Sequence, residues 1–246
     1  MFFHKHPYEP FIPENATKLI VGTLPPPRFS TGDLHEKDVD FCYGSYHNSL
    51  WKKIDAIHNL GLRYDNSQDA IDERKQFLIQ RNIGVCDIVD SAEREKIDAS
   101  DLGMQNIKLR DVIGYIKQYP NIDTLLFTGG NSKNGPEYFF RKHIKAYNIK
   151  LELVSNEVPR IHQFYLPVDT ERSRSATKVH NQKVVAERSR STNNERSRSI
   201  KTVSLTSGSG AANISISRLP LYKQLKAKNP NFNTFDFRVM QYREFF

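Results

Sequence analysis

The chain has 246 residues, 38% of them hydrophobic and 26% charged, with a formal net charge of +8. This length suits one large α/β domain, so we expect a single domain over 1–246. No apolar run approaches the ~18 residues of a transmembrane helix and no signal-peptide pattern follows Met1, which predicts a cytosolic protein that does not bind membranes.

The predicted elements alternate between strands and helices along the chain. In chain order they are a strand at 18–23, helices at 48–59 and 69–80, a strand at 83–89, a helix at 109–118, a strand at 123–128, a helix at 136–146, strands at 150–154, 163–166 and 202–205, and a helix at 219–228. This order is typical of a mostly parallel sheet between helices, so we expect a three-layer α/β/α fold.

One segment interrupts the pattern and holds most of the positive charge. The pentapeptide Glu-Arg-Ser-Arg-Ser begins at Glu171, Glu187 and Glu195, at spacings of 16 and 8 residues that do not form a structural repeat. Residues 171–201 contain nine lysines and arginines against three glutamates, so the rest of the chain has a net charge of only +2. We expect a disordered, low-complexity insertion loop at 170–201. The alternative is an Arg/Ser-rich arm that binds nucleic acid.

The first candidate segment is Gly22-Thr23-Leu24-Pro25, which closes the first strand. It follows the carboxyl end of the strand, where open α/β sheets bind ligands. It lacks the glycine spacing of a dinucleotide fingerprint and the Gly-Lys-Ser/Thr ending of a P-loop, which excludes both readings. Its prolines stiffen a turn whose backbone groups could read a planar ligand, although a plain strand-to-loop turn would have the same sequence.

A second segment runs from Tyr43 to Trp51 at the start of the first long helix. Asn48 is placed either to cap that helix or to carry chemistry. Tyr43 precedes a glycine, which would leave one face of its ring open for a base. Trp51 recurs with its neighbours at helical spacing and is expected in the core.

The third segment combines small residues and hydroxyl groups between the last strand and a helix. It includes Ser207, Ser209 and Asn213. Such loops bind phosphate through backbone N–H groups and serine hydroxyls, although an ordinary Gly/Ser turn has the same composition. These three residues are therefore candidate phosphate ligands.

At these residues the sequence resembles the uracil-DNA glycosylase superfamily, and most closely its hypoxanthine-DNA glycosylase branch. Five segments carry the resemblance in order: Gly22-Thr23-Leu24-Pro25, Tyr43-Gly44-Ser45-Tyr46-His47-Asn48-Ser49-Leu50-Trp51, Gly84-Val85-Cys86-Asp87-Ile88-Val89, Phe127-Thr128-Gly129, and Leu205-Thr206-Ser207-Gly208-Ser209-Gly210-Ala211-Ala212-Asn213. The resemblance implies a uracil-DNA glycosylase-like fold and removal of a deaminated base, uracil or hypoxanthine, from DNA.

The resemblance also implies roles for single residues. Asn48 matches the branch's catalytic asparagine, and Tyr43 matches the aromatic residue that stacks on the extruded base. Residues 22–25 would read the base edge, while Ser207 and Ser209 would pinch the DNA backbone. Asp87 is a second catalytic candidate that could orient water or stabilise a cationic sugar, and its alternative is a structural, hydrogen-bonded role.

Several positions depart from the branch pattern. Leu24 stands where other branches carry a catalytic asparagine, and Thr128 replaces an expected asparagine. Residues 45–47 read Ser-Tyr-His in place of His-Pro-Arg, while Gly208 and Gly210 replace residues that stiffen the phosphate loop. These changes bear on substrate preference and on activity.

We therefore expect a monomeric glycosylase acting on DNA, associated with the nucleoid, without a metal or cofactor. Two cysteines without Cys-x-x-Cys spacing suit reduced, structural thiols rather than a metal site. Lys52 and Lys53 lie beyond Trp51 and give no ground for a Schiff-base nucleophile, so a monofunctional enzyme is expected. The alternatives are a catalytically weak nucleic-acid-binding protein with an Arg/Ser-rich arm, and an enzyme acting on a small nucleotide.

Overall fold

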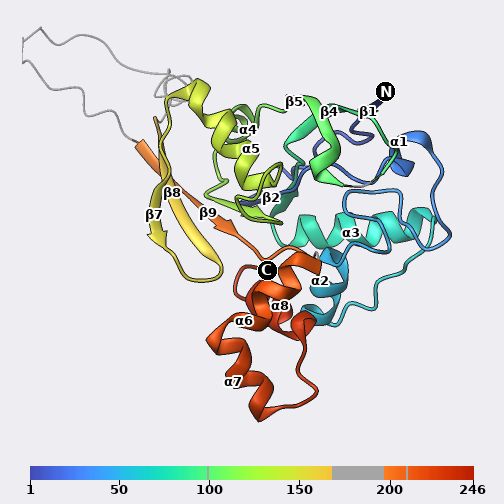
Figure 1. Cartoon of the computed structure of the whole chain (residues 1–246). Helices are drawn as coiled ribbons and strands as arrows, with labels where there is room; N and C mark the ends of the chain where they lie inside the picture. Colours follow the sequence, from blue (N-terminus) through green and yellow to red (C-terminus); the bar gives the residue numbers. More distant parts are fainter. Residues whose placement is uncertain (99, 168–196, 209) are drawn as a thin grey trace, which may run out of the picture.

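The computed structural model describes residues 1–98, 100–167, 197–208 and 210–246. Its main feature is a six-stranded sheet with the strand order β3-β2-β6-β9-β8-β7 (Figure 1). The bounds of these strands are β2 (Lys18–Val21), β3 (Ile83–Val85), β6 (Thr124–Phe127), β7 (Glu152–Ser155), β8 (Arg160–Pro167) and β9 (Ser197–Ser204). Strands β3, β2, β6 and β9 are parallel to one another. At the edge, β8 pairs antiparallel to β9, and β7 pairs antiparallel to β8.

Alternation along the strands divides the core into two layers. Leu19 and Val21 of β2 face one apolar cluster and Ile20 faces the other, as the two-residue period of a strand requires. The first cluster includes residues of α4 (Val112–Gln118) and α5 (Pro136–His143). The second includes residues of α2 (Leu50–His58), α3 (Gln68–Gln80) and α8 (Thr234–Arg243). The expected mostly parallel sheet between helices is confirmed.

A second, three-stranded antiparallel sheet was not predicted. It consists of β1 (Phe2–Lys5), β4 (Val89–Arg94) and β5 (Met104–Leu109) in the order β1-β4-β5. The predicted strand at 83–89 is wrong in extent, since β3 ends at Val85 and β4 begins at Val89 in the other sheet. Polar residues fill much of β4 and β5, so the apolar pattern that marks the central strands is weak there.

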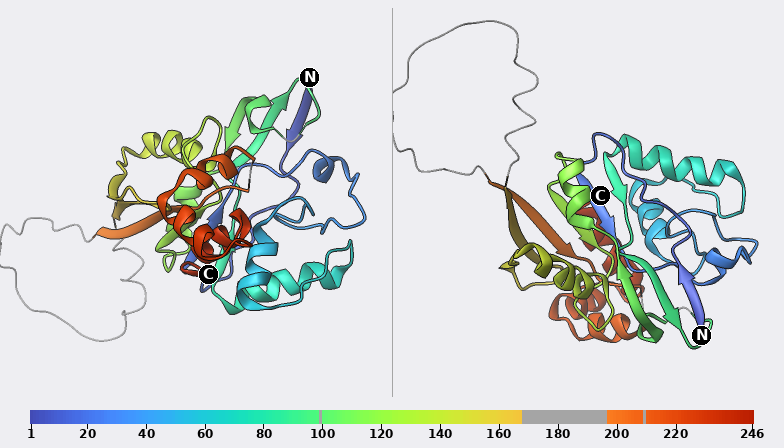
Figure 2. Two further views of the ribbon diagram at one scale, coloured as in Figure 1. Left: turned by 60° about the horizontal axis from the view of Figure 1, so that its bottom comes forward. Right: turned by 90° about the horizontal axis from the view of Figure 1, so that it is seen from above.

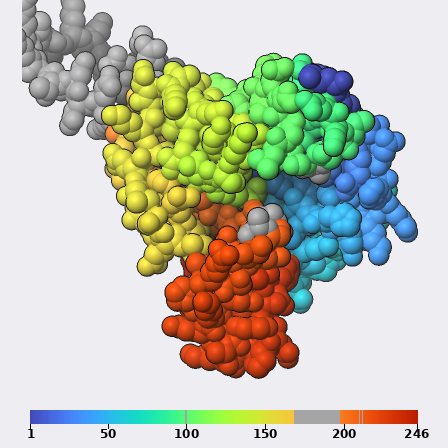
Figure 3. Space-filling model, in the orientation of Figure 1, coloured from blue at the N-terminus to red at the C-terminus, as the bar shows by residue number. Residues whose placement is uncertain are grey.

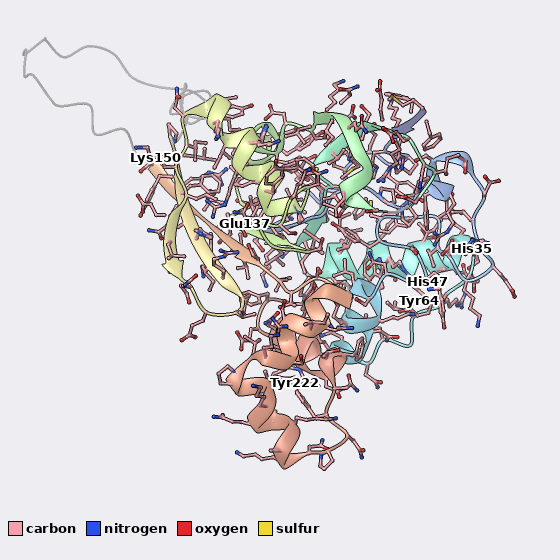
Figure 4. All side chains as sticks on the ribbon, in the orientation of Figure 1. His35, His47, Tyr64, Glu137, Lys150 and Tyr222 are labelled. Atoms are coloured by element: carbon pink, nitrogen blue, oxygen red, sulfur yellow. The ribbon has the colours of Figure 1, made fainter. Side chains whose placement is uncertain are left out.

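The C-terminal helices form one group beside the main sheet, as two further views show (Figure 2). They are α6 (Gly210–Arg218), α7 (Pro220–Lys228) and α8; α1 (Arg28–Thr31) lies in the N-terminal third. Helix α8 begins with a capping box between Asn233 and Asp236. Tyr222 on α7 lies far from His47, which is beside α2 (Figure 4). Among the described residues, we find no helix with the length and apolar character needed to cross a bilayer.

The expected insertion loop at 170–201 needs a correction at its end. Ser197 to Lys201 belong to strand β9 and pair with β8 or β6, so this part is not a loop. Arg198, from the third pentapeptide, donates hydrogen bonds to the carbonyl oxygens of Ile122 (2.9 Å), Ile116 and Pro120. These bonds tie that arginine to the fold rather than to a nucleic acid. The rest of the expected insertion lies outside the described residues.

Deleting residues 170–194 should leave the melting temperature within a few degrees of the wild type. Pro167 and Ser197 are paired across β8 and β9, so a short connection can join the strands, and loop-closure entropy changes slowly with length. A longer deletion, 170–200, also removes four strand residues and the Arg198 bonds, and should lower the melting temperature much more. Thermal unfolding followed by circular dichroism checks both variants. An equal fall in melting temperature for both variants would contradict the assignment of residues 197–200 to strand β9.

Candidate active site

A pocket of about 360 Å³ lies at the carboxyl ends of the four parallel strands. Each strand contributes the residues that follow it: 23–26 after β2, Asp87 after β3, Thr128 after β6, and 207–208 after β9. The last residues of three of these strands are paired: Val21 of β2 with Phe127 of β6, and Phe127 with Ser204 of β9. These strands therefore end at the same level of the sheet. This is the edge at which open α/β sheets bind ligands.

The other walls of the pocket come from loops and helices. They are contributed by residues of 43–50, by Lys53 of α2, by Asp101 and by Tyr242 of α8. In the space-filling view, the blue N-terminal, yellow-green and red C-terminal segments meet at a hollow near the centre of the face (Figure 3). The pocket thus brings together segments that lie far apart in sequence.

Asp87 anchors the floor of the pocket through three donors. Its Oδ1 accepts hydrogen bonds from the Gly22 backbone N–H (3.1 Å) and from the Tyr43 hydroxyl (2.6 Å). Its Oδ2 lies 3.0 Å from Nε2 of His6. His6 Nδ1 accepts the Tyr8 backbone N–H (3.1 Å), so the His6 proton sits on Nε2 and is donated to Asp87.

The protonation of Asp87 follows from these contacts. Burial raises the pKa of its carboxyl, but the hydrogen bonds from His6 and Tyr43 outweigh burial and hold the pKa below the ordinary value. Asp87 is therefore a carboxylate at neutral pH. The structural, hydrogen-bonded role that was the alternative for Asp87 is present, and the side chain also lines the pocket.

The ring of Tyr43 is held in place by its backbone and by its hydroxyl. Tyr43 has a φ of 59°, in the left-handed region that non-glycine residues rarely adopt. Its neighbour Gly44 packs so closely that an added Cβ would lie 1.8 Å from the Val39 carbonyl oxygen, so a glycine is required there. A Cβ on Gly22 would lie 2.5 Å from the Tyr43 hydroxyl and 2.6 Å from Asp87 Oδ1. The strand turn and the ring thus lie in direct contact.

Asn48 lies at the pocket mouth, and its side chain is partly engaged. The N-cap of α2 is Ser49, whose side chain makes no capping bond. Instead Asn48 Oδ1 accepts the backbone N–H of Leu50 at 2.8 Å. Because that N–H needs an acceptor, the side-chain oxygen of Asn48 is fixed toward the helix. The side-chain nitrogen of Asn48 has no protein partner among the described residues. Asn48 thus lies one residue before the N-cap, accepts the first helical N–H, and lines the pocket with an amide nitrogen that is left to donate.

The loop after β9 forms the opposite wall. Arg238 of α8 donates from Nε to the Ser207 carbonyl oxygen at 2.8 Å, which fixes the loop backbone. Asn213 does not line the pocket, because its Oδ1 accepts hydrogen bonds from Arg238 (2.7 Å) and Thr234 (3.1 Å). Ser209 lies outside the described residues. Ser207 and Gly208 are therefore the part of the expected phosphate loop that the pocket contains.

Gly208 lies directly against the start of α2, and Gly208→Ala should move the loop. An added Cβ would lie 2.6 Å from Ser49 Oγ, so either that hydroxyl rotates or the loop shifts. We expect Gly208→Ala to lower the free energy of unfolding and the Gly208→Ala/Ser49→Ala double variant to recover it, with a coupling of about 1 kcal/mol. Urea unfolding of the four proteins of this cycle measures the coupling. Additive effects would contradict the contact.

Asp101 is a pocket residue that the sequence reasoning missed. It lies in the short 3₁₀ helix η1 (Asp101–Gly103), and its Oδ1 accepts the Thr23 hydroxyl at 3.0 Å. Burial raises the pKa of its carboxyl to about 6, despite the hydrogen bond from Thr23. The pocket therefore holds two carboxyl groups, Asp87 and Asp101, whose pKa values are moved in opposite directions, a pattern that separates acid and base roles in enzymes. No motif surrounds Asp101 that could have identified it.

Lys53 is the second missed residue, and it removes the ground for expecting a monofunctional enzyme. That expectation rested on the position of Lys52 and Lys53 beyond Trp51 on a helix, which gave no ground for a Schiff-base nucleophile, whereas Lys53 lines the pocket and is 2% exposed. Trp51 itself is in the core as expected, 1% exposed. The helical spacing of Leu50, Lys53 and Ile54 on one buried face was the available signal.

Among residues 1–98, 100–167, 197–208 and 210–246, we find no group of three His, Cys, Asp or Glu side chains that could hold a metal ion. Cys42 and Cys86 are free and buried, which agrees with structural thiols. In comparisons with known proteins, no family model matches the chain and no curated protein matches it.

Proposed function

We propose that the protein is a DNA glycosylase with a uracil-DNA glycosylase-like fold that hydrolyses the N-glycosidic bond of a deaminated base, uracil or hypoxanthine. One observation carries the proposal: all five segments of the resemblance, dispersed between residues 22 and 213, contribute to a single pocket at the carboxyl edge of the sheet. We further propose that it acts on DNA as a cytosolic monomer, without a metal or cofactor.

The base would enter the pocket after extrusion from the duplex. Extrusion costs a few kcal/mol, and least for a mispaired base, which favours deaminated bases in mismatches. Tyr43 would stack on the base, and its fixed ring needs no ordering on binding. Residues 22–25 would contact the base edge through backbone groups, while Ser207 and Gly208 contact the adjacent phosphate.

Asn48 would act on the leaving base. Since its Oδ1 is held by Leu50, its amide N–H groups are left to donate to the base as negative charge develops there. The sugar becomes cationic in the same step. The carboxylate of Asp87 supplies the negative charge that stabilises this cation, and it also holds the Tyr43 ring.

A direct assay tests the proposed function. Labelled duplexes carrying uracil, hypoxanthine or only normal bases are incubated with the protein and then treated with alkali, which cuts abasic sites. Strand cleavage after alkali in the duplexes that carry uracil or hypoxanthine, and not in the duplex with only normal bases, supports the proposal. Tight binding without excision would favour the non-catalytic nucleic-acid-binding alternative. Release of a base from a free nucleotide but not from DNA would favour a small-molecule enzyme.

A further inference from the structure

The side chain of Lys53 is buried beside the proposed reaction centre and has no carboxylate partner among the described residues. It lies on the inner face of α2 between Leu50 and Ile54, and its neighbour Lys52 lies outside with Nζ 3.8 Å from the centroid of the Tyr46 ring. Most buried lysines are paired with a carboxylate. Among the described residues, Lys53 Nζ has neither an ion pair nor a hydrogen-bond acceptor, which is costly unless the amine is used.

Two neighbours of Lys53 act on its charge in opposite directions. Its Nζ lies 3.9 Å from the centroid of the Tyr242 ring, whose face attracts an ammonium group, whereas Arg238 of α8 repels one. Burial, followed by the positive charge of Arg238, lowers the pKa of Lys53 to about 7. A large fraction of the amine is therefore unprotonated near neutral pH, and a neutral lysine in a desolvated pocket is a nucleophile for carbonyl carbon.

The position of Lys53 places this amine near the sugar of the substrate. Lys53 lines the same pocket as Asn48, Ser49 and Leu50. It follows Asn48, whose amide is proposed to act on the glycosidic bond, by five residues along the chain. Once the base has left, the abasic sugar opens to an aldehyde at C1′. An electrophilic carbonyl would then lie in a pocket that contains an unpaired amine.

We propose that Lys53 is a catalytic nucleophile that makes the protein an abasic-site lyase as well as a glycosylase. This inference rests on the proposed function for its substrate. Nζ forms a bond to C1′ of the aldehyde, and the aldehyde oxygen leaves as water with one proton from the amine and one from solvent, giving a protonated imine. Loss of a C2′ proton to water then expels the 3′ phosphate, so the C3′–O bond breaks and the strand is cut without an oxidant or reductant.

The test uses a duplex with a preformed abasic site, which bypasses base excision. Wild-type protein mixed with this duplex and borohydride should give a covalent adduct, and peptide mapping by mass spectrometry should place it on Lys53. Lys53→Met keeps the apolar stem and should abolish the adduct and strand cutting, whereas Lys52→Met should retain both. Without borohydride, the cutting rate should rise with pH through about 7. Thermal unfolding confirms that both variants are folded.

The outcomes separate this inference from the proposed function. An adduct on the preformed abasic site without excision of uracil or hypoxanthine supports Lys53 and rejects the glycosylase. Excision with no adduct rejects the lyase alone and restores a monofunctional enzyme. An adduct that maps to the N-terminal amine, or one that Lys53→Met retains undiminished, also overturns the role of Lys53.

Discussion

Replacing Asn48 by alanine is expected to slow base excision by about a hundredfold or more under single-turnover conditions, the effect of losing one preorganised donor. Asn48 lines the pocket and its amide nitrogen has no protein partner among the described residues, so we expect its loss to fall on the transition state. DNA affinity should change little. The measurement is a time course with protein in excess over a uracil- or hypoxanthine-containing duplex.

The control must separate catalysis from helix capping, because Asn48 also accepts the Leu50 N–H. Asn48→Asp keeps an oxygen for that bond and removes the amide donor. It should retain the stability of the wild type and lose activity, whereas a pure capping role would cost about 1 kcal/mol in Asn48→Ala and leave the chemistry intact. Wild-type excision by folded Asn48→Ala protein would reject the catalytic assignment and direct attention to Asp87.

Replacing Asp87 by asparagine should lower the free energy of unfolding by about 2–3 kcal/mol, the cost of leaving buried groups without their charged partner. All three protein neighbours of the carboxylate are donors: His6 Nε2, the Gly22 N–H and the Tyr43 hydroxyl. An asparagine must turn its own N–H groups toward at least one of them. Urea unfolding at neutral pH gives the value, with Asp72→Asn as an exposed control that should change little.

The pH dependence of this difference has a definite sign. Because the folded pKa of Asp87 is below the ordinary value of 3.8, its carboxylate stabilises the protein fully at pH values above that value. The stabilisation disappears as the pH falls through the folded pKa. The difference in stability between the wild type and Asp87→Asn should therefore be constant from about pH 6 to 8 and shrink below about pH 4. A difference that grows in acid would contradict the assignment.

The parts of the fold that could be predicted are those with strong apolar periodicity. The strand at Lys18–Val21 is buried on both faces and flanked by a Pro-rich turn, and the helix at Gln68–Gln80 begins at a serine cap. Both were located to within two residues. The sheet β1-β4-β5 was not predicted because β1 and β5 are partly exposed and polar residues fill much of β4 and β5, so its pairing depends on tertiary contacts that periodicity does not encode.

The candidate site was predictable only where residues follow strand ends. Thr23, Asp87 and Ser207 each follow a strand of the parallel set, and the geometry of a parallel sheet brings such residues to one edge. His6, Asp101 and Lys53 reach the same region from a terminal segment, a 3₁₀ turn and a helix face. Their positions depend on packing between segments that are distant in sequence, such as the contacts of His6 with Asp87 and of Asp101 with Thr23, which no local pattern specifies.

The contact at Gly22 has a consequence for how this site can vary among related chains. A side chain at position 22 cannot coexist with the bond between Tyr43 and Asp87, because its Cβ would overlap both partners. A substitution at any one of these three positions therefore changes what the other two can accept. Positions 22, 43 and 87 should covary as a unit in an alignment, with larger residues at 22 only where the tyrosine or the aspartate has been lost.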